Sequence, residues 1–317
     1  MADIRKPKPL TPVTRRLVGH ATDIMQDDPQ QVLFQHTVLC QTFFPYRDQG
    51  NNVREWTRTN GQVALYLQAG TVMSPDTGEM LKIGLPFGPK SRLLLAHLNS
   101  RALKQGQRRI DIEEGSLTAF VKTMQDPLKR KAIAPNGREV RAFKDQLTRL
   151  SAANIMLATR TAEGKAQHRK PQIIDGFELW LQKYENQRVL WPDHIDLSHE
   201  YFESLQCHAV PLDERALAAL GHSAMALDIY SWLAQRLHRI PSGKDIFLPR
   251  SILKQQFGAG YGRQNNFAHA FKEALRQALS QYTAANISLT TEGLTLSHSP
   301  PPVPSRLFVI ASPATSN

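Results

Sequence analysis

The polar side chains best suited to specific chemistry lie between residues 263 and 282, at helical spacing. Apolar residues recur there at i, i+4, i+7 and i+8, from Phe267 to Leu279, so that stripe must be buried. The opposite face and the helix start would carry amides, an imidazole and cations: Arg263, Gln264, Asn265, Asn266, His269, Lys272 and Arg276. Asparagine can bond an adenine edge in two places, and arginine or lysine can bond a guanine edge or a phosphate. The face therefore predicts nucleic-acid binding, although the same pattern also suits the solvated side of an ordinary amphipathic helix.

A second helix with a similar division of faces is expected over residues 138–151. Its apolar side would bury Val140, Phe143, Leu147 and Leu150, and its outer side would show Arg138, Arg141, Asp145 and Thr148, with Lys144 at the edge. This helix offers more charge and fewer amides, so we expect it to contact phosphates more than bases. The loop that follows the next strand carries Lys165, His168, Arg169 and Lys170, which would form a basic wing suited to phosphate or to the minor groove.

The sequence matches none of three motifs that would indicate an enzyme or a metal site. A phosphate-binding loop fails because Gly243-Lys244 is followed by Asp245. A rolling-circle nicking enzyme needs two histidines one residue apart, and none of the 11 histidines is so spaced. The group His194, His199, Cys207 and His208 matches no zinc spacing. We therefore expect a protein that is not an enzyme, with no metal and no cofactor.

The order of the elements around these residues favours winged-helix domains, a helix-turn-helix variant, in an α+β fold. Alternating strands over 53–85 flank the hairpin signal Asn60-Gly61. After them we expect helix, strand, helix, helix, strand, basic loop and strand between residues 91 and 181. In this order the third helix is the one that enters the major groove.

The second half repeats this order between residues 226 and 299, which predicts tandem domains. The segment AFKDQL at 142–147 parallels AFKEAL at 270–275, and AANI at 152–155 parallels AANI at 284–287. Two short matches in the same place of the order argue for a duplicated domain, although chance similarity of two such helices remains an alternative. The expected division is a basic flexible arm (1–45), a first winged-helix domain with an N-terminal hairpin (46–181), a connector (182–200), a second winged-helix domain (201–299) and a Pro-rich disordered tail (300–317).

The net charge of +11 favours a polyanionic partner, and its distribution is informative. Residues 81–170 hold 19 Lys and Arg against 7 Asp and Glu, residues 171–240 hold 5 against 10, and residues 241–280 hold 6 against 2. Two basic blocks separated by an acidic stretch suit two phosphate-facing elements.

The chain has two cysteines, no apolar run of membrane-span length and an N-terminus without an apolar core. These features predict a cytoplasmic protein with no membrane partner.

Several of these segments resemble a known family. LPFGPKSRLLLAHLNSRAL, SLTAFVK, NGREVRAFKDQLTRLSAANI, RVLWP, HAVPLDERALAALGHSAMALDIYSWLAQRLHRI and GLTLSHSPPPV are similar to the plasmid-encoded RepA family of replication initiators, over residues 40–303. The resemblance implies binding of double-stranded DNA at repeated sites of a plasmid origin, help in opening the duplex, and recruitment of the host replicative helicase and host initiator. It also implies a possible homodimer and repression of its own gene, and it supplies no catalytic residues. The alternative is a winged-helix transcriptional regulator without origin function, and a nicking enzyme is a more distant one.

Overall fold

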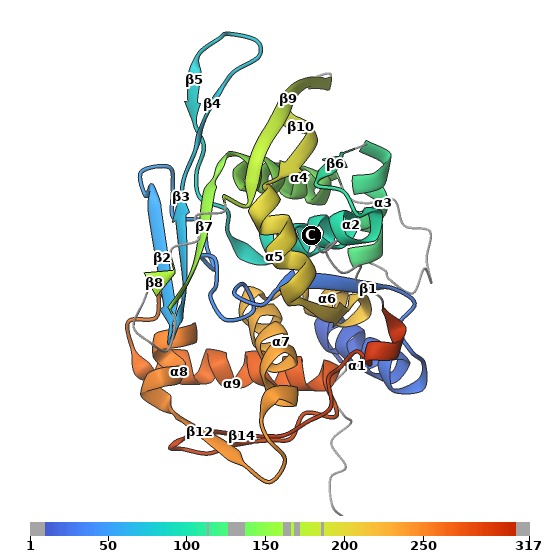
Figure 1. Cartoon of the computed structure of the whole chain (residues 1–317), viewed down its shortest axis with the longest axis vertical. Helices are drawn as coiled ribbons and strands as arrows, with labels where there is room; N and C mark the ends of the chain where they lie inside the picture. The colour runs from blue at the N-terminus through green and yellow to red at the C-terminus, as the bar shows by residue number, and fades with distance from the viewer. Residues whose placement is uncertain are drawn as a thin grey trace, which may run out of the picture.

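The computed structural model describes residues 10–112, 114–125, 137–160, 166–167, 172–184 and 187–308. They form an α+β fold in which every pair of hydrogen-bonded strands is antiparallel. Strand-rich segments lie in the upper part of the view and the helices of the C-terminal third lie below them (Figure 1). Along the described chain, no helix combines the length and the apolarity that crossing a membrane requires.

A first unit runs from α2 to β10. Its elements are α2 (Gly88–Gln105), β6 (Arg109–Asp111), α3 (Glu114–Gln125), α4 (Gly137–Ala152), β9 (Ile174–Tyr184) and β10 (Gln187–Leu197). Gly106, with φ of +64°, ends α2 in the left-handed conformation that glycine adopts without strain. β9 and β10 form a long hairpin, and β6 pairs with the outer side of β10, which gives the sheet order β6-β10-β9.

A second unit runs from α7 to β14 and repeats this plan. Its elements are α7 (Ala224–Arg236), the single turn η1 (Leu237–Arg239), β12 (Asp245–Pro249), α8 (Arg250–Phe257), α9 (Gln264–Gln281), β13 (Ile287–Leu289) and β14 (Gly293–Ser297). The strand before the helix pair again joins the last strand, in the sheet order β12-β14-β13. α4 and α9 therefore occupy equivalent places in two units of the same topology.

The strand over residues 154–160 departs from the expected arrangement. It forms β7 (Asn154–Arg160), which pairs with β3 (Val63–Gln68) in a separate sheet with β2 (Glu55–Asn60) and β8 (Ala166–Gln167). The buried side chains of β7, Ile155 and Leu157, pair with the buried Leu67 and Leu65 of β3. The expectation that this strand and the strand after the basic loop form a wing is therefore wrong, because β7 pairs with β3 and β9 pairs with β10.

Residues 55–82 form two consecutive hairpins, β2–β3 and β4–β5. β2 and β3 meet at Asn60-Gly61, as the sequence predicts, and Gly61 has a φ of +57°. β4 (Thr71–Met73) and β5 (Met80–Lys82) form a narrow hairpin that projects from the upper end of the molecule (Figure 1).

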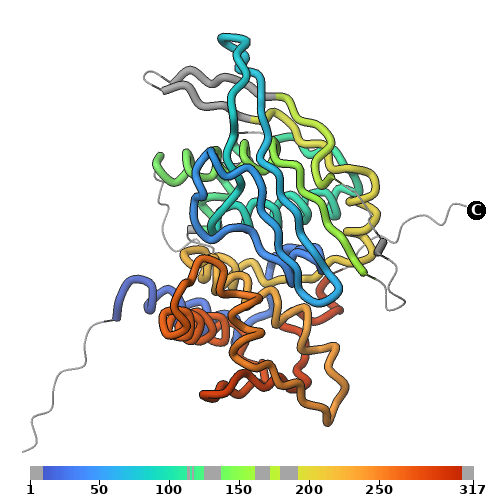
Figure 2. The backbone as a smooth tube through the Cα atoms, turned by 90° about the vertical axis from the view of Figure 1, so that its left-hand side faces the viewer, coloured from blue at the N-terminus to red at the C-terminus, as the bar shows by residue number. Residues whose placement is uncertain are grey.

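Residues 10–45 are folded, which corrects the expectation of a flexible arm over that range. α1 (Pro12–Gln26) begins at Thr11, whose hydroxyl accepts a hydrogen bond from the Thr14 amide, and it packs against α6 (Glu214–Leu220) and α9. β1 (Val32–His36) is buried along its whole length and pairs with β11 (Ala209–Asp213). Figure 2 shows the N-terminal helix lying against the lower part of the molecule. The apolar residues of β1, Val32, Leu33 and Phe34, are part of the hydrophobic core.

The connector and the tail also differ from the expected division. β10 runs to Leu197 within the first sheet, so the link between the units consists of α5 (His199–His208), β11 and α6 (Glu214–Leu220). In the predicted disordered tail, Val303 is buried, a single turn η2 (Ser305–Leu307) follows, and the Phe308 ring meets the Phe34 ring edge-on. The remainder of the tail, from residue 309, lies outside the described residues.

A buried ion pair joins the two units. The Arg92 guanidinium of α2 donates to both carboxylate oxygens of Asp228 in α7, at 2.6 and 2.8 Å. Its remaining donors reach the carbonyl oxygens of Gly88, Phe44 and Pro45. Such complete pairing is what a buried charge requires.

Acid is expected to destabilise the fold through His36 of β1. Its Nδ1 accepts a hydrogen bond from the Val38 amide and its Nε2 lies 3.0 Å from the Ser204 hydroxyl, so the neutral ring carries its proton on Nε2. Burial, and then the nearby His208, lower the pKa of His36 to about 3. The unfolded chain, with an ordinary histidine pKa of about 6.5, takes up this proton first as the pH falls. Stability is therefore present above pH 6.5 and is lost below it, by about 2 kcal/mol at pH 5 from this group.

The measurement is urea unfolding at pH 7 and pH 5. The variant His36→Gln should show a smaller loss between the two pH values than the wild type, and the exposed His269→Gln should match the wild type. Full protonation of the His36 ring at pH 5 in the folded protein, seen by NMR, would contradict the prediction.

Candidate nucleic-acid interface

α9 has one buried and one exposed side. The side chains that pack inward are Phe267, Phe271, Ala274, Leu275 and Ala278. Outward lie Asn265, Asn266, His269, Lys272 and Arg276, and Arg263 is exposed at the residue before the helix. Gln264 is half-buried at the start of the helix. The structure thus brings all seven residues that the sequence singled out onto one helix and its start, and their contact with DNA stays a prediction.

The C-terminal half of α9 is tied to the rest of the protein. Gln281 donates to the Leu17 carbonyl of α1, and Gln277 bonds His222, which also contacts Arg16. The N-terminal half, from Asn265 to Lys272, is the more accessible part for an approaching ligand.

Arg276 lies at the border of these two halves. It forms an exposed pair with Glu273 at 2.7 Å, and this pair together with Gln277 lowers the pKa of Glu273. An exposed pair of this kind contributes little energy, so the guanidinium can exchange its partner for a phosphate at small cost.

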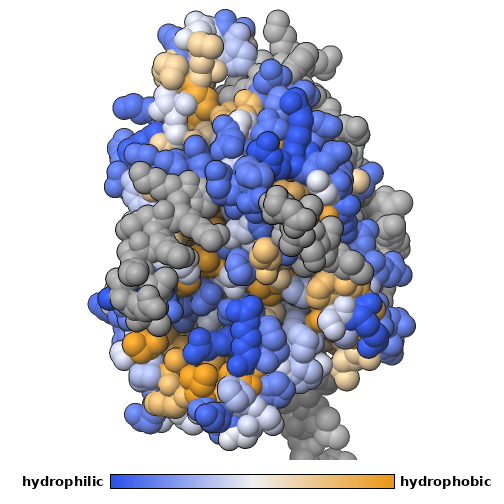
Figure 3. Space-filling view, in the orientation of Figure 1, coloured by the Kyte–Doolittle hydropathy of each residue, from blue (hydrophilic) through white to orange (hydrophobic). Residues whose placement is uncertain are grey.

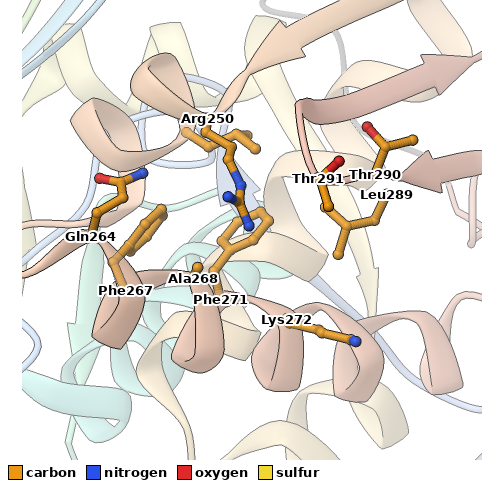
Figure 4. A pocket seen from close by; sticks show the side chains of 10 residues that line it. Arg250, Gln264, Phe267, Ala268, Phe271, Lys272, Leu289, Thr290 and Thr291 are labelled. Atoms are coloured by element: carbon orange, nitrogen blue, oxygen red, sulfur yellow. The ribbon is translucent and has the colours of Figure 1, made fainter.

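A hollow of about 260 Å³ lies between α9, α8 and the β13–β14 turn. Its floor is apolar and its rim carries two cations and two hydroxyl groups; the lining residues are Arg250, Leu253, Gln264, Phe267, Ala268, Phe271, Lys272, Leu289, Thr290 and Thr291. Figure 4 shows Arg250 extending from α8 into the hollow, whereas Lys272 points along α9. Cations and hydroxyls around a hollow at a helix suit the phosphates and sugars of a nucleic acid.

Three of these rim residues were missed by the sequence reasoning. Arg250 is the first residue of α8, and Thr290 and Thr291 form the turn of a hairpin that contains no cation. The signal that could have found them is the tandem order itself, since it places the start of the second helix and the hairpin turn beside the third helix.

The surface around the hollow is not uniformly polar. Figure 3 shows apolar side chains gathered at the lower end of this face, over α8, α9 and β12. Phe247 of β12 and Ile252 of α8 are among the exposed large apolar residues, and Leu289 is partly exposed within the hollow itself. Apolar groups at such a place can contact thymine methyl groups or sugars.

α4 offers a narrower polar face than expected. Arg138 and Arg141 are exposed near its start, but Lys144 is only 3% exposed and Thr148 is buried too. The reason is that α4 packs against α2 on one side and against α3 and β10 on others, so a wider stripe is covered. The prediction that Lys144 lies at the edge of the DNA-facing side is therefore wrong.

The predicted basic wing flanks β8. Lys165, His168, Arg169 and Lys170 lie outside the described residues, on either side of β8. β8 pairs with the end of β7, at the edge of the sheet formed by β2, β3 and β7. The hairpin that joins β6 in the first unit's sheet is β9–β10.

Comparison with known proteins identifies the family. The family model described as plasmid encoded RepA protein matches residues 85–249, from just before α2 to the end of β12. Searches of the curated proteins and of the solved structures found no match. The family match spans more than half of the 317 residues, so the chain belongs to the family of plasmid-encoded RepA proteins.

Proposed function

We propose that this chain is a plasmid replication initiator that binds repeated sites at its origin through two winged helices. The observation that carries the proposal is the repeated topology, in which the strand before a helix pair joins the last strand of a hairpin in both units. In a winged helix this arrangement holds the third helix against the major groove. Family membership supports a role in plasmid replication.

The third helices of the two units, α4 and α9, would make different contacts with the DNA. α9 presents amides and an imidazole on its accessible half, which are groups that can distinguish base edges. α4 presents Arg138 and Arg141 and no exposed amide in its N-terminal half, which suits phosphate contact. Because Arg92 and Asp228 fasten α2 to α7, the two helices would meet DNA with a fixed spacing.

This spacing would place the helices in successive major grooves, about 10–10.5 base pairs apart, on sites of about 20 base pairs. Bound at several repeats, the protein would help to open the adjacent duplex and recruit the host helicase and host initiator. It would also repress its own gene, work in the cytoplasm and act without enzymatic chemistry, metal or cofactor in these steps.

DNase footprinting on the plasmid's own repeats should show protection over about two helical turns. Asn265→Ala should weaken binding to the specific site by about 10- to 100-fold, equivalent to about 1–3 kcal/mol, and leave binding to random DNA almost unchanged. Lys272→Ala should weaken both about equally, since a lysine on a phosphate carries no sequence information.

The exposed Asn52, far along the chain from α9, serves as the matched control, and Asn52→Ala should bind as the wild type does. Protection over a single half-turn, or an unchanged footprint with Asn265→Ala, would mean that the second unit does not read bases. Whether the gene and its adjacent repeats sustain a plasmid with no other origin separates an initiator from a transcriptional regulator.

A further inference from the structure

A β-bulge in the β9–β10 hairpin brings three metal-ligating side chains together. Pro192 of β10 pairs with Leu179 of β9 and Ile195 pairs with Phe177, so two residues, Asp193 and His194, stand opposite the single Glu178. Consecutive residues of a regular strand point to opposite faces, and a bulge removes that restriction. As a result, one ligand atom from each of Glu178, Asp193 and His194 lies within 4.8 Å of the other two.

His194 brings a buried ring nitrogen close to the two carboxylates. It is only 7% exposed, and its Nδ1 has no hydrogen-bond partner among the described residues. Its Nε2 faces Oδ2 of Asp196 at 3.5 Å, while Nδ1 faces Oε2 of Glu178 at 4.0 Å. With its proton on Nε2, toward Asp196, the ring would direct the Nδ1 lone pair at the Glu178 carboxylate. A buried lone pair facing negative charge is unfavourable unless a cation or a proton lies between them.

We propose that Glu178, Asp193 and His194 bind one divalent first-row transition-metal ion, with Asp196 as the positioning residue for the imidazole. One nitrogen and two carboxylate ligands suit Zn²⁺, Co²⁺ or Mn²⁺, and an imidazole ligand disfavours Mg²⁺ and Ca²⁺. Bonds of about 2.0–2.2 Å need ligand atoms about 3–4 Å apart, so the two exposed carboxylates must rotate inward only slightly. A carboxylate behind a metal-bound histidine is a recurring arrangement, because it fixes the tautomer and the orientation of the ring.

The group differs from the one weighed in the sequence, which combined His194 with His199, Cys207 and His208. The ligands come from the two strands of the first unit's hairpin, so they are close in space only because that hairpin bulges. The ion would lie at the base of the hairpin, beside β6, with coordination positions left for water or for an oxygen of a bound anion.

The test is titration of the full-length protein, carrying no histidine tag, with Co²⁺ followed by absorption and with Zn²⁺ followed by calorimetry. We expect one ion per chain with the wild type. His194→Gln, Glu178→Gln and Asp193→Asn should each weaken binding at least tenfold, and Asp196→Asn should weaken it by about 10- to 100-fold. Glu178 and Asp193 are exposed, so those two variants keep the test decisive if His194→Gln fails to fold.

The matched control is the exposed pair of His199 and Glu203 in α5, at 3.1 Å. His199→Gln and Glu203→Gln should bind the metal as the wild type does. No binding by the wild type at millimolar metal, or equal affinity in the wild type and in Glu178→Gln and Asp193→Asn, would overturn the proposal. DNA binding by the metal-free protein tests the proposed function separately, because none of the three ligands lies on α4 or α9.

Discussion

Replacing Asp228 by asparagine is expected to lower the free energy of unfolding by about 3–5 kcal/mol. The variant keeps the size of the side chain but leaves the Arg92 guanidinium buried without its counter-charge. Since a domain is stable by only about 5–15 kcal/mol, this loss should be visible as a large fall in the urea midpoint. The two units should also separate more easily, because the pair joins α2 to α7.

Two variants control this result. Arg92→Met combined with Asp228→Leu removes both charges and should be more stable than Asp228→Asn, since apolar residues can replace a buried pair, although the carbonyls of Gly88, Phe44 and Pro45 lose their donor. Glu273→Gln breaks an ion pair of similar length on the surface, at 2.7 Å, and should cost less than about 1 kcal/mol. If Asp228→Asn unfolds at the same urea concentration as Glu273→Gln, the buried pair does not hold the units together.

DNA affinity is expected to fall about a thousandfold between 50 and 200 mM salt. Six exposed cations lie on or beside the helices and the hollow that face the proposed DNA: Arg138, Arg141, Arg250, Arg263, Lys272 and Arg276. Each phosphate contact contributes about −0.9 to the slope of log affinity against log salt, so the slope should be about −5. Fluorescence anisotropy with labelled duplex at several salt concentrations measures it.

Removing one phosphate-contacting cation should change the slope of log affinity against log salt by a fixed amount. Lys272→Ala should make it shallower by about 1, whereas Lys82→Ala, an exposed lysine of the projecting β4–β5 hairpin, should leave it unchanged. A wild-type slope shallower than about −2 would contradict an electrostatic contact that involves both units.

The third helices of the two units, α4 and α9, show which side chains the local apolar pattern can predict to be buried and which it cannot. The apolar spacing of residues 263–282 is sufficient to locate α9 and to predict which side chains it buries, because helix periodicity depends only on neighbours in the chain. α4 has the same kind of pattern, but Lys144 is buried because α2, α3 and β10 cover more of that helix than one face. The width of the buried stripe on a helix depends on how many elements surround the helix. The apolar periodicity of the sequence does not predict how many there are.

Strand pairing likewise has a part that neighbouring residues predict and a part that depends on distant segments. Asn60-Gly61 predicts the β2–β3 hairpin because a tight turn is a local feature. The partner of β7 is not local, since an alternating strand can join any sheet edge whose buried positions match its own. β7 pairs with β3 and not with β9, whereas β9 pairs with β10, so the strands on either side of residues 161–170 do not form a hairpin with each other.

The sequence by itself determined the helices of both units, the order of elements in the second unit, the repeat that relates the two units and the polar face of α9. These follow from periodicity, turn residues and charge, which act over a few residues. Only the tertiary structure decided that residues 10–45 are folded, that Arg92 meets Asp228 across 136 positions, and that Asp193 and His194 turn together toward Glu178. Each of these depends on which distant segments bury one another, and that choice is made by the packing of the whole chain.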